Sequence, residues 1–154
     1  MEWFDKHIRK PIDLFSHPVW FILQDDDILC PCVDFTTKQA DEECPVCLGT
    51  GKKIKLAHVN AAHQNNRISL RGTGLGFSEI DIVNVYYTHN QTSIKIGDII
   101  IDGSDVDIVK DVYYEHSDEQ KNVFYRIETV PYKKDKNEFI KRFKKLLKEA
   151  GYNV

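Results

Sequence analysis

The sequence predicts a mainly β fold: a small antiparallel β-barrel or sandwich with a short N-terminal helix, a zinc-ribbon-like excursion and a C-terminal amphipathic helix. Three observations lead to this prediction. Short runs of β-branched and aromatic residues recur between turn signals in the second half of the chain. All four cysteines lie within residues 30–47. The C-terminal residues change to the spacing of apolar side chains that a helix requires.

Composition and length favour one domain spanning residues 1–154. The chain is 42% hydrophobic and 29% charged, and it is long enough to bury a core without covalent help. It has no apolar run of membrane-spanning length, and residues 1–15 lack the apolar stretch of a signal peptide. We therefore expect no membrane association and a reducing cytosol, where clustered cysteines bind metal or catalyse more often than they form disulfides.

The chain divides into parts by its periodicity and its turn signals. Apolar residues within 1–15 follow a helical spacing, and Pro11 is expected to break or kink this helix. A strand is expected at 19–23, and the acidic triplet 25–27 indicates a turn before the first cysteine. In chain order, we expect an amphipathic segment at 1–18, a zinc-knuckle excursion at 28–53, a β-barrel at 54–132 and a helix at 135–151.

Within the barrel, turn chemistry separates the strands. Residues 60–77 are polar and glycine-rich, so we expect a long loop around a short strand. Its GTGLG is not expected to hold phosphate, because a strand follows where a phosphate-binding motif needs a helix. Residues 93–96 are short and β-prone, and Asp102-Gly103 is a strong hairpin signal. A last strand is expected at 123–130.

The C-terminal helix carries one apolar face and one lysine-rich face. Asp135 and Glu138 resemble a capping box, and Gly151 provides a stop. Residues 131–154 have a net charge of +5, which leaves −8 for the rest of the chain. The basic face is either a solvated surface or one that docks a partner or nucleic acid. The apolar face consists of Phe139, Ile140, Phe143, Leu146, Leu147 and Ala150.

The cysteines follow the pattern C-x-C, then C-x-x-C, which is typical of a structural zinc site. Two short pairs on neighbouring loops supply the four soft ligands that Zn²⁺ prefers, and four thiolates leave no open position for a substrate. Gly49 and Gly51 allow the backbone to turn sharply and to bring N–H groups near the thiolates. The predicted metal ligands are Cys30, Cys32, Cys44 and Cys47.

Other roles for the cysteines are weighed against zinc. A redox pair at Cys44 and Cys47 would need a helix N-terminus, and the residues that follow start a helix poorly. Structural disulfides require an oxidising compartment, and His58 or His63 could replace one cysteine ligand. The loop between the cysteine pairs, residues 33–43, is acidic, which favours a basic protein partner over phosphate.

The residues CPVCLGTG, from Cys44 to Gly51, resemble the C-x-x-C-x-G-x-G repeats of the zinc centre in J-protein co-chaperones. Those proteins carry four repeats and a J domain, whereas this chain has one repeat and no HPD signature. The resemblance therefore implies a zinc knuckle and does not imply co-chaperone function.

The run IKIGDIIIDGSDVDIVKDVYYEH…VFYRIETVPYKK, within 94–134, resembles small β-barrel head-completion proteins of tailed bacteriophages. The pairs C-P-C and C-P-x-C-x-G-T-G are also similar to those of phage neck proteins. The resemblance implies a non-enzymatic virion protein that forms a homo-oligomeric ring in the neck, between portal or adaptor and tail proteins. DNA would pass through the ring without sequence specificity. Assembly would take place in the host cytoplasm, with loops 60–77 and 88–93, the excursion and the terminal helices meeting neighbours.

The main alternative is a zinc-ribbon module that binds nucleic acid or a regulatory protein. Its support is the basic C-terminal helix, which has enough charge for a few phosphate contacts. The acidic remainder of the chain argues against it. We expect no enzyme, because the sequence shows neither an open metal site nor a nucleophile with its partners.

Overall fold

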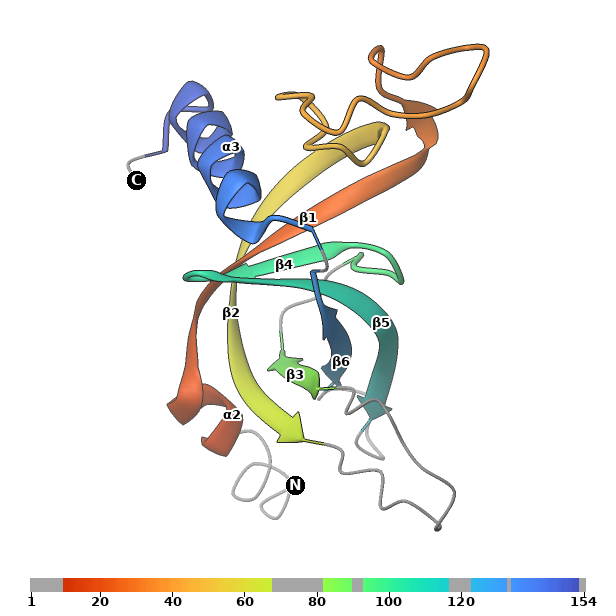
Figure 1. Cartoon of the computed structure of the whole chain (residues 1–154). Coiled ribbons are helices and arrows are strands. Elements are labelled where there is room, and N and C mark those ends of the chain that lie inside the picture. The colour runs from red at the N-terminus through yellow and green to blue at the C-terminus, as the bar shows by residue number, and fades with distance from the viewer. Residues whose placement is uncertain (1–9, 68–81, 90–92, 117–122, 133, 153–154) are drawn as a thin grey trace, which may run out of the picture.

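The computed structural model describes residues 10–67, 82–89, 93–116, 123–132 and 134–152. Six antiparallel strands form one sheet that closes on itself, with a short helix before it and a longer helix after it (Figure 1). This confirms the predicted mainly β fold. The elements are α2 (Lys10–Phe15), β1 (Ser16–Leu29), β2 (Lys52–Arg67), β3 (Ile82–Thr88), β4 (Ile99–Asp102), β5 (Asp105–His116), β6 (Val123–Pro131) and α3 (Lys136–Glu149).

The strands follow the order β1-β2-β3-β6-β5-β4, and β4 pairs back onto β1. That closing contact is short, running from Trp20 opposite Ile101 to Ile22 opposite Ile99. The predicted hairpin at Asp102-Gly103 joins β4 to β5, with Asp102 opposite Asp105. Closure leaves this part of the sheet without a free edge, which protects it from pairing with other chains.

Side chains that alternate along each strand fill the inside of the barrel. Phe21, Ile100 and Ile127 are completely buried there, and they come from three different strands. The full inner cluster is Val19, Phe21, Val59, Ala61, Tyr86, Ile94, Ile100, Val109, Tyr125 and Ile127.

Helix α3 packs on the outside of the barrel through the apolar stripe that the sequence predicts. Phe139, Phe143 and Leu147 are buried against the outer side chains of β1, β4 and β5. The Asp135 carboxylate accepts hydrogen bonds from two backbone N–H groups of the first turn. Gly151 follows the helix with a φ of 90°, a left-handed conformation that suits glycine.

Helix α2 covers another part of the barrel surface. Ile12 packs with Ala62 and Phe124, and Pro11 lies in the first turn, where a missing N–H group is tolerated. The expected segment 1–18 is therefore wrong at its end, because Ser16 already begins β1. Residues 1–9 lie outside the described part of the chain.

The expected barrel range 54–132 is also wrong, because β1 is one of the barrel strands. The acidic triplet 25–27 belongs to β1 instead of forming a turn, and residues 60–67 belong to β2 instead of a loop. Both are held by strand pairing: Asp25 lies opposite Lys53, and Asn60 lies opposite Pro18. Backbone hydrogen bonds there outweigh the weak β-propensity of polar residues.

Beyond Ile22, β1 pairs only with β2, so the two strands leave the barrel as an arm that carries residues 30–51 (Figure 1). The β-prone residues 93–96 form no strand; they lead into a turn in which Gly97 has a φ of 95°. The GTGLG of the expected long loop, residues 90–92 and residues 117–122 lie outside the described residues.

Candidate metal centre

The two-stranded arm brings the cysteine pairs together. Leu29 is the last residue of β1 and lies opposite Lys52, the first residue of β2. Next to this pair, the Cys30 N–H group donates to the Gly51 carbonyl oxygen at 2.9 Å. The excursion is thus closed at its base, and all four cysteines lie inside the closed loop.

The four predicted cysteine ligands form one compact cluster of thiols. Their Sγ atoms all lie within 4.8 Å of one another. Sγ of Cys30 is 3.8 Å from that of Cys44, and Sγ of Cys32 is 3.5 Å from that of Cys47. A tetrahedral site with metal–sulfur bonds of about 2.3 Å places its sulfur atoms about 3.8 Å apart. The cluster therefore has the dimensions of a four-thiolate metal site.

Local turns direct backbone N–H groups at the sulfur atoms, as expected for the glycine-containing segment. The Gly51 N–H group donates to Cys47 Sγ at 3.4 Å, and Leu48 N–H donates to the Cys44 carbonyl oxygen at 3.0 Å. Gly49 has a φ of 84°, and a Cβ atom there would lie 3.0 Å from a backbone oxygen of the same excursion. Glycine is required at this position by conformation and by space.

The surroundings of the thiols affect their pKa values differently. Burial raises the pKa of Cys30, and burial together with the neighbouring thiols raises that of Cys32 to about 12. Burial also acts on Cys44, but N–H groups of Cys47 and Val46 outweigh it and lower its pKa to about 7. A cation is needed to hold Cys30 and Cys32 as thiolates at neutral pH, and its binding would release their protons.

The geometry does not favour the alternative uses of these cysteines. All four are free, and sulfur atoms more than 3 Å apart are not joined by a disulfide, whose bond is about 2 Å long. Cys44 and Cys47 lie in consecutive turns and not at the start of a helix. His58 stacks on Trp20, and His63 contacts Asp102, so neither belongs to the cluster.

The excursion is fastened to α3 and the barrel. Leu48, between the second cysteine pair and Gly49, is 2% exposed and joins the cluster under α3. Lys134 Nζ lies 2.8 Å from the Glu42 carboxylate, and Arg142 donates to the Glu42 carbonyl oxygen at 2.6 Å. The carboxylate of Glu42, one of the acidic groups of the loop 33–43, is therefore paired within the chain.

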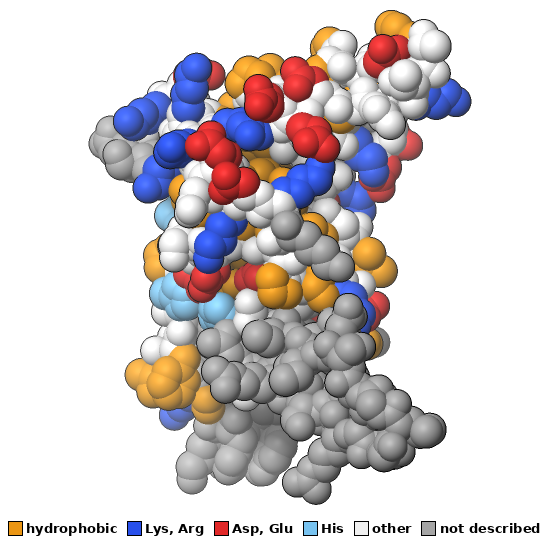
Figure 2. Space-filling model, in the orientation of Figure 1, with side chains coloured by type: hydrophobic (Ala, Val, Ile, Leu, Met, Phe, Trp, Pro, Cys, Tyr) orange, Lys and Arg blue, Asp and Glu red, His pale blue; other side chains and the backbone are white. Residues whose placement is uncertain are grey.

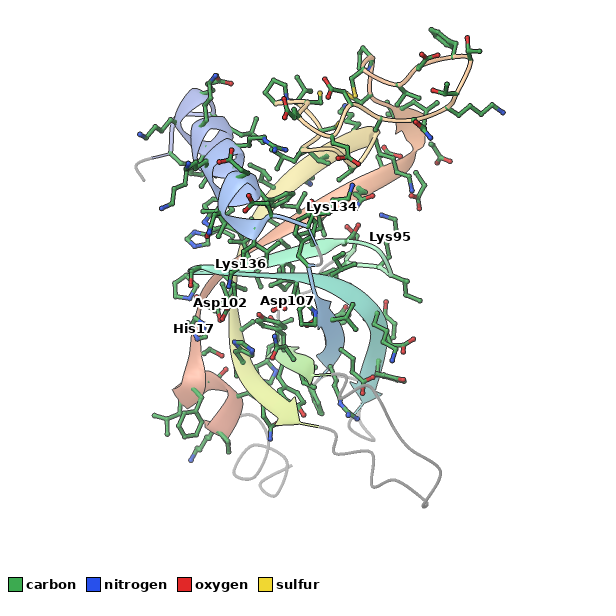
Figure 3. All side chains as sticks on the ribbon, viewed as in Figure 1. His17, Lys95, Asp102, Asp107, Lys134 and Lys136 are labelled. Atoms are coloured by element: carbon green, nitrogen blue, oxygen red, sulfur yellow. The ribbon has the colours of Figure 1, made fainter. Side chains whose placement is uncertain are left out.

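A polar network at the barrel interior has no clear sequence signal. The Asp102 carboxylate lies 2.8 Å from His17 Nε2 (Figure 3) and 3.0 Å from His63 Nδ1, and the three residues come from three strands. Asp107, which is 2% exposed, accepts hydrogen bonds from Asn84 and from the Tyr86 hydroxyl group. Burial raises the pKa of Asp107. These hydrogen-bond partners could be found from the sequence only if the strand register, and with it the set of inward-facing positions, were already known.

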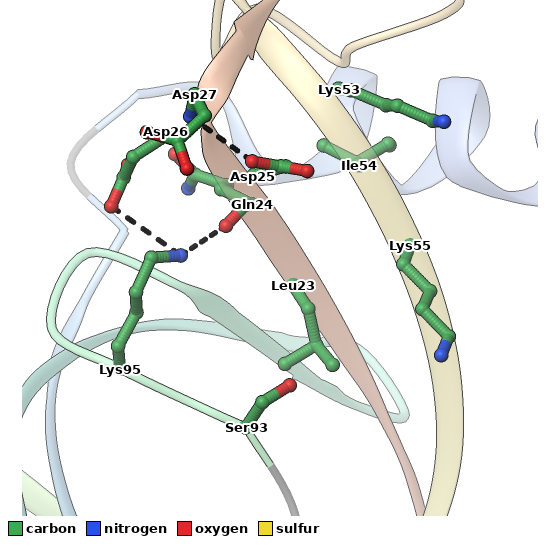
Figure 4. A pocket seen from close by; sticks show the side chains of 10 residues that line it. All are labelled: Leu23, Gln24, Asp25, Asp26, Asp27, Lys53, Ile54, Lys55, Ser93 and Lys95. Atoms are coloured by element: carbon green, nitrogen blue, oxygen red, sulfur yellow. Dashed lines mark hydrogen bonds and ion pairs between the residues drawn. The ribbon is translucent and has the colours of Figure 1, made fainter.

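A hollow of about 480 Å³ lies at the root of the arm and is visible from close by in Figure 4. Lys95 crosses one side of it, donating to the Gln24 carbonyl oxygen and lying 3.1 Å from Asp98 and 3.9 Å from Asp26. Lys53 and Lys55 extend from β2 on the other side. The contacts of Lys95 join the arm to the loop before β4. They explain the position of this lysine without a bound ligand.

Comparison with known proteins leaves the family open. No protein-family model matches the sequence, and the curated proteins give no match. Within the described residues, no helix is both long and apolar enough to cross a membrane. The proposals below therefore depend on the geometry of this chain and on the resemblances in its sequence.

Proposed function

We propose that this chain is a non-enzymatic virion protein that forms a ring in the neck of a tailed bacteriophage, between portal and tail, and holds a structural zinc ion. The observation that carries the metal part is the compact cluster of four thiols in the excursion that the arm carries. Sulfur ligands favour zinc, copper(I) or iron–sulfur clusters, and four sulfurs in tetrahedral dimensions fit zinc. With all four positions taken by protein, the ion would have a structural role.

The arm gives the metal site its function in this proposal. An excursion of this size has few apolar side chains of its own to bury, so a metal supplies the energy that fixes its shape. Phe35, near the tip, is 97% exposed, and Ile28, Leu29 and Val46 are also largely exposed. We take these exposed apolar side chains of the arm and its excursion as its candidate contact residues. The metal would hold this contact surface ready for assembly.

The neck assignment depends on the resemblance of 94–134 to head-completion proteins. Support from the structure is limited to the small closed barrel and the projecting arm, which suit a subunit that contacts neighbours through extensions. A barrel alone does not determine function. A zinc-ribbon module for nucleic acid or a regulatory protein is the second candidate, favoured by lysines of α3 that form no ion pair with any described residue.

The test of the proposed function is particle assembly in the phage that encodes the chain. Without the protein, heads should fill with DNA but fail to retain it or to join tails, and the wild-type gene supplied in trans should restore infectious particles. Cys44→Ser/Cys47→Ser should not restore them, whereas Thr37→Ala, an exposed change on the same excursion, should. Normal tailed and infectious particles without the protein would contradict the proposal.

A further inference from the structure

One flank of α3 carries a row of lysines, which we name the lysine stripe: Lys141, Lys144 and Lys148. Their spacing of three and four residues places them on one side of the helix. Lys141 lies 3.2 Å from Glu138, whereas Lys144 and Lys148 take part in no ion pair within the described part of the chain. Figure 2 shows blue side chains gathered over the helix at the upper left.

The lysine stripe faces away from the arm. Arg142 marks the side of α3 that faces the excursion, because it donates to the Glu42 carbonyl oxygen. With about 100° between successive residues, Lys144 lies about 160° and Lys148 about 120° around the helix from Arg142. Lysines of the stripe therefore cannot reach the acidic residues of their own arm.

The first strand of the arm and the excursion carry the opposite charge. Residues 24–51 include seven acidic residues and one lysine, whereas the β2 side of the arm carries Lys52, Lys53 and Lys55. Five of the acidic residues are exposed and take part in no ion pair among the described residues, and we name them the acidic surface: Asp25, Asp27, Asp34, Asp41 and Glu43. Phe35 follows Asp34 in the sequence and is almost fully exposed. A basic partner would meet both charge and an apolar anchor here.

We infer that copies of this chain associate head to tail, with the acidic surface of one copy against the lysine stripe of the next. Each copy presents one surface of each sign on different flanks, so every contact leaves a free surface at both ends. Such a heterologous contact repeats, and it closes into a ring when the rotation between copies allows it. The inference rests on the proposed ring and assigns its interface.

A second copy fits these observations better than nucleic acid does. The chain has a net charge of −3, and the acidic arm lies beside α3, where it would repel phosphates. Phosphate contacts would use the lysine stripe and leave the acidic surface and Phe35 without a role. A contact between two copies pairs one acidic surface with one lysine stripe, so both surfaces take part.

Sedimentation of the metal-loaded chain at about 0.1 M and about 1 M salt tests the electrostatic part, since the Debye length falls from about 10 Å to about 3 Å. We expect association that depends on concentration at the lower salt and weakens at the higher. Lys144→Glu/Lys148→Glu should raise the dissociation constant at least about tenfold. The control Lys55→Glu/Lys110→Glu makes the same change in net charge at exposed lysines elsewhere and should leave it nearly unchanged.

A mixing experiment tests the pairing of the two surfaces. Asp27→Lys/Glu43→Lys alters the acidic surface at two side chains that make no hydrogen bond among the described residues, and it should likewise raise the dissociation constant of the variant alone at least about tenfold. Mixed with Lys144→Glu/Lys148→Glu, it should form one-to-one heterodimers and nothing larger, because one intact surface of each kind is then available. Equal metal content and thermal midpoints would show that all the variants are folded.

The possible outcomes separate this inference from the proposed function. A wild-type chain that stays monomeric at low salt overturns the pairing. So does an oligomer whose dissociation constant is the same in the wild type and in both double variants. The second result leaves a ring in place, and particle assembly decides the proposed function independently. Binding of duplex DNA that Lys144→Glu/Lys148→Glu abolishes, with no association between copies, would overturn the pairing in favour of nucleic acid.

Discussion

Truncation of Phe143 on α3 tests whether the C-terminal helix is part of this chain's own core. The side chain is 3% exposed and lies edge-on to Trp20 of β1, with ring centroids 5.8 Å apart. Phe143→Ala removes a buried ring and leaves a cavity, which costs about 3–5 kcal/mol of unfolding free energy. The lost aromatic pair accounts for about 0.5–1.5 kcal/mol of that value.

The loss is large enough to measure directly. In a chain of this length, each kcal/mol lowers the midpoint of thermal unfolding by about 2–4 °C, so we expect a decrease of about 6–20 °C. Denaturant unfolding of the metal-loaded protein, followed by circular dichroism in dilute solution, gives the free energy. Lys145→Ala, an exposed change on the same helix, should stay within about 0.5 kcal/mol. A loss below about 1 kcal/mol for Phe143→Ala would refute the packing of α3 on its own barrel.

Three further changes test the metal centre and the barrel interior. Cys47→Ser should abolish tight metal binding and open residues 30–51 to proteolysis while strand signals in circular dichroism persist; a metal-free variant with a protected excursion would contradict this. Gly49→Ala should weaken metal retention and cost about 1–3 kcal/mol, because it combines a positive φ with a backbone contact at 3.0 Å; Gly103→Ala has a positive φ but open space around it and should leave the metal in place. Burial raises the pKa of Asp107, so its contribution to stability is fully present below its ordinary pKa of 3.8 and is lost as the pH rises through the folded-state value. Between about pH 3 and about pH 7, the unfolding free energy of the wild type should therefore fall relative to that of Asp107→Asn. A difference between the two that stays constant with pH would show that the Asp107 carboxyl group does not titrate in this way.

The parts of the fold that the sequence predicts well have local signals. The apolar stripe of α3 depends only on residues within one helix. The β4–β5 hairpin depends only on Asp102-Gly103 and the apolar runs beside it. The cysteine cluster is predictable for the same reason, since both pairs lie in one short excursion. In each case, the residues that determine the structure are close together in the sequence.

The errors arise where distant pairing decides the structure. Asp25 lies in a strand because β2 pairs with it along the arm, and Asn60 lies in a strand because Pro18 is its neighbour in β1. The contact of Asp102 with His17 joins residues 85 positions apart. A single sequence contains no register between such segments, so neither the arm nor the interior network could be predicted from it.

The most direct test of the account is the metal content of the wild-type chain, purified under reducing conditions without chelator and without added metal. Elemental analysis should find about one zinc per chain, retained through dialysis, because four converging thiolates form a closed site. A chain that is folded with its arm intact and contains no metal would contradict the structural metal centre from which the proposed function is argued.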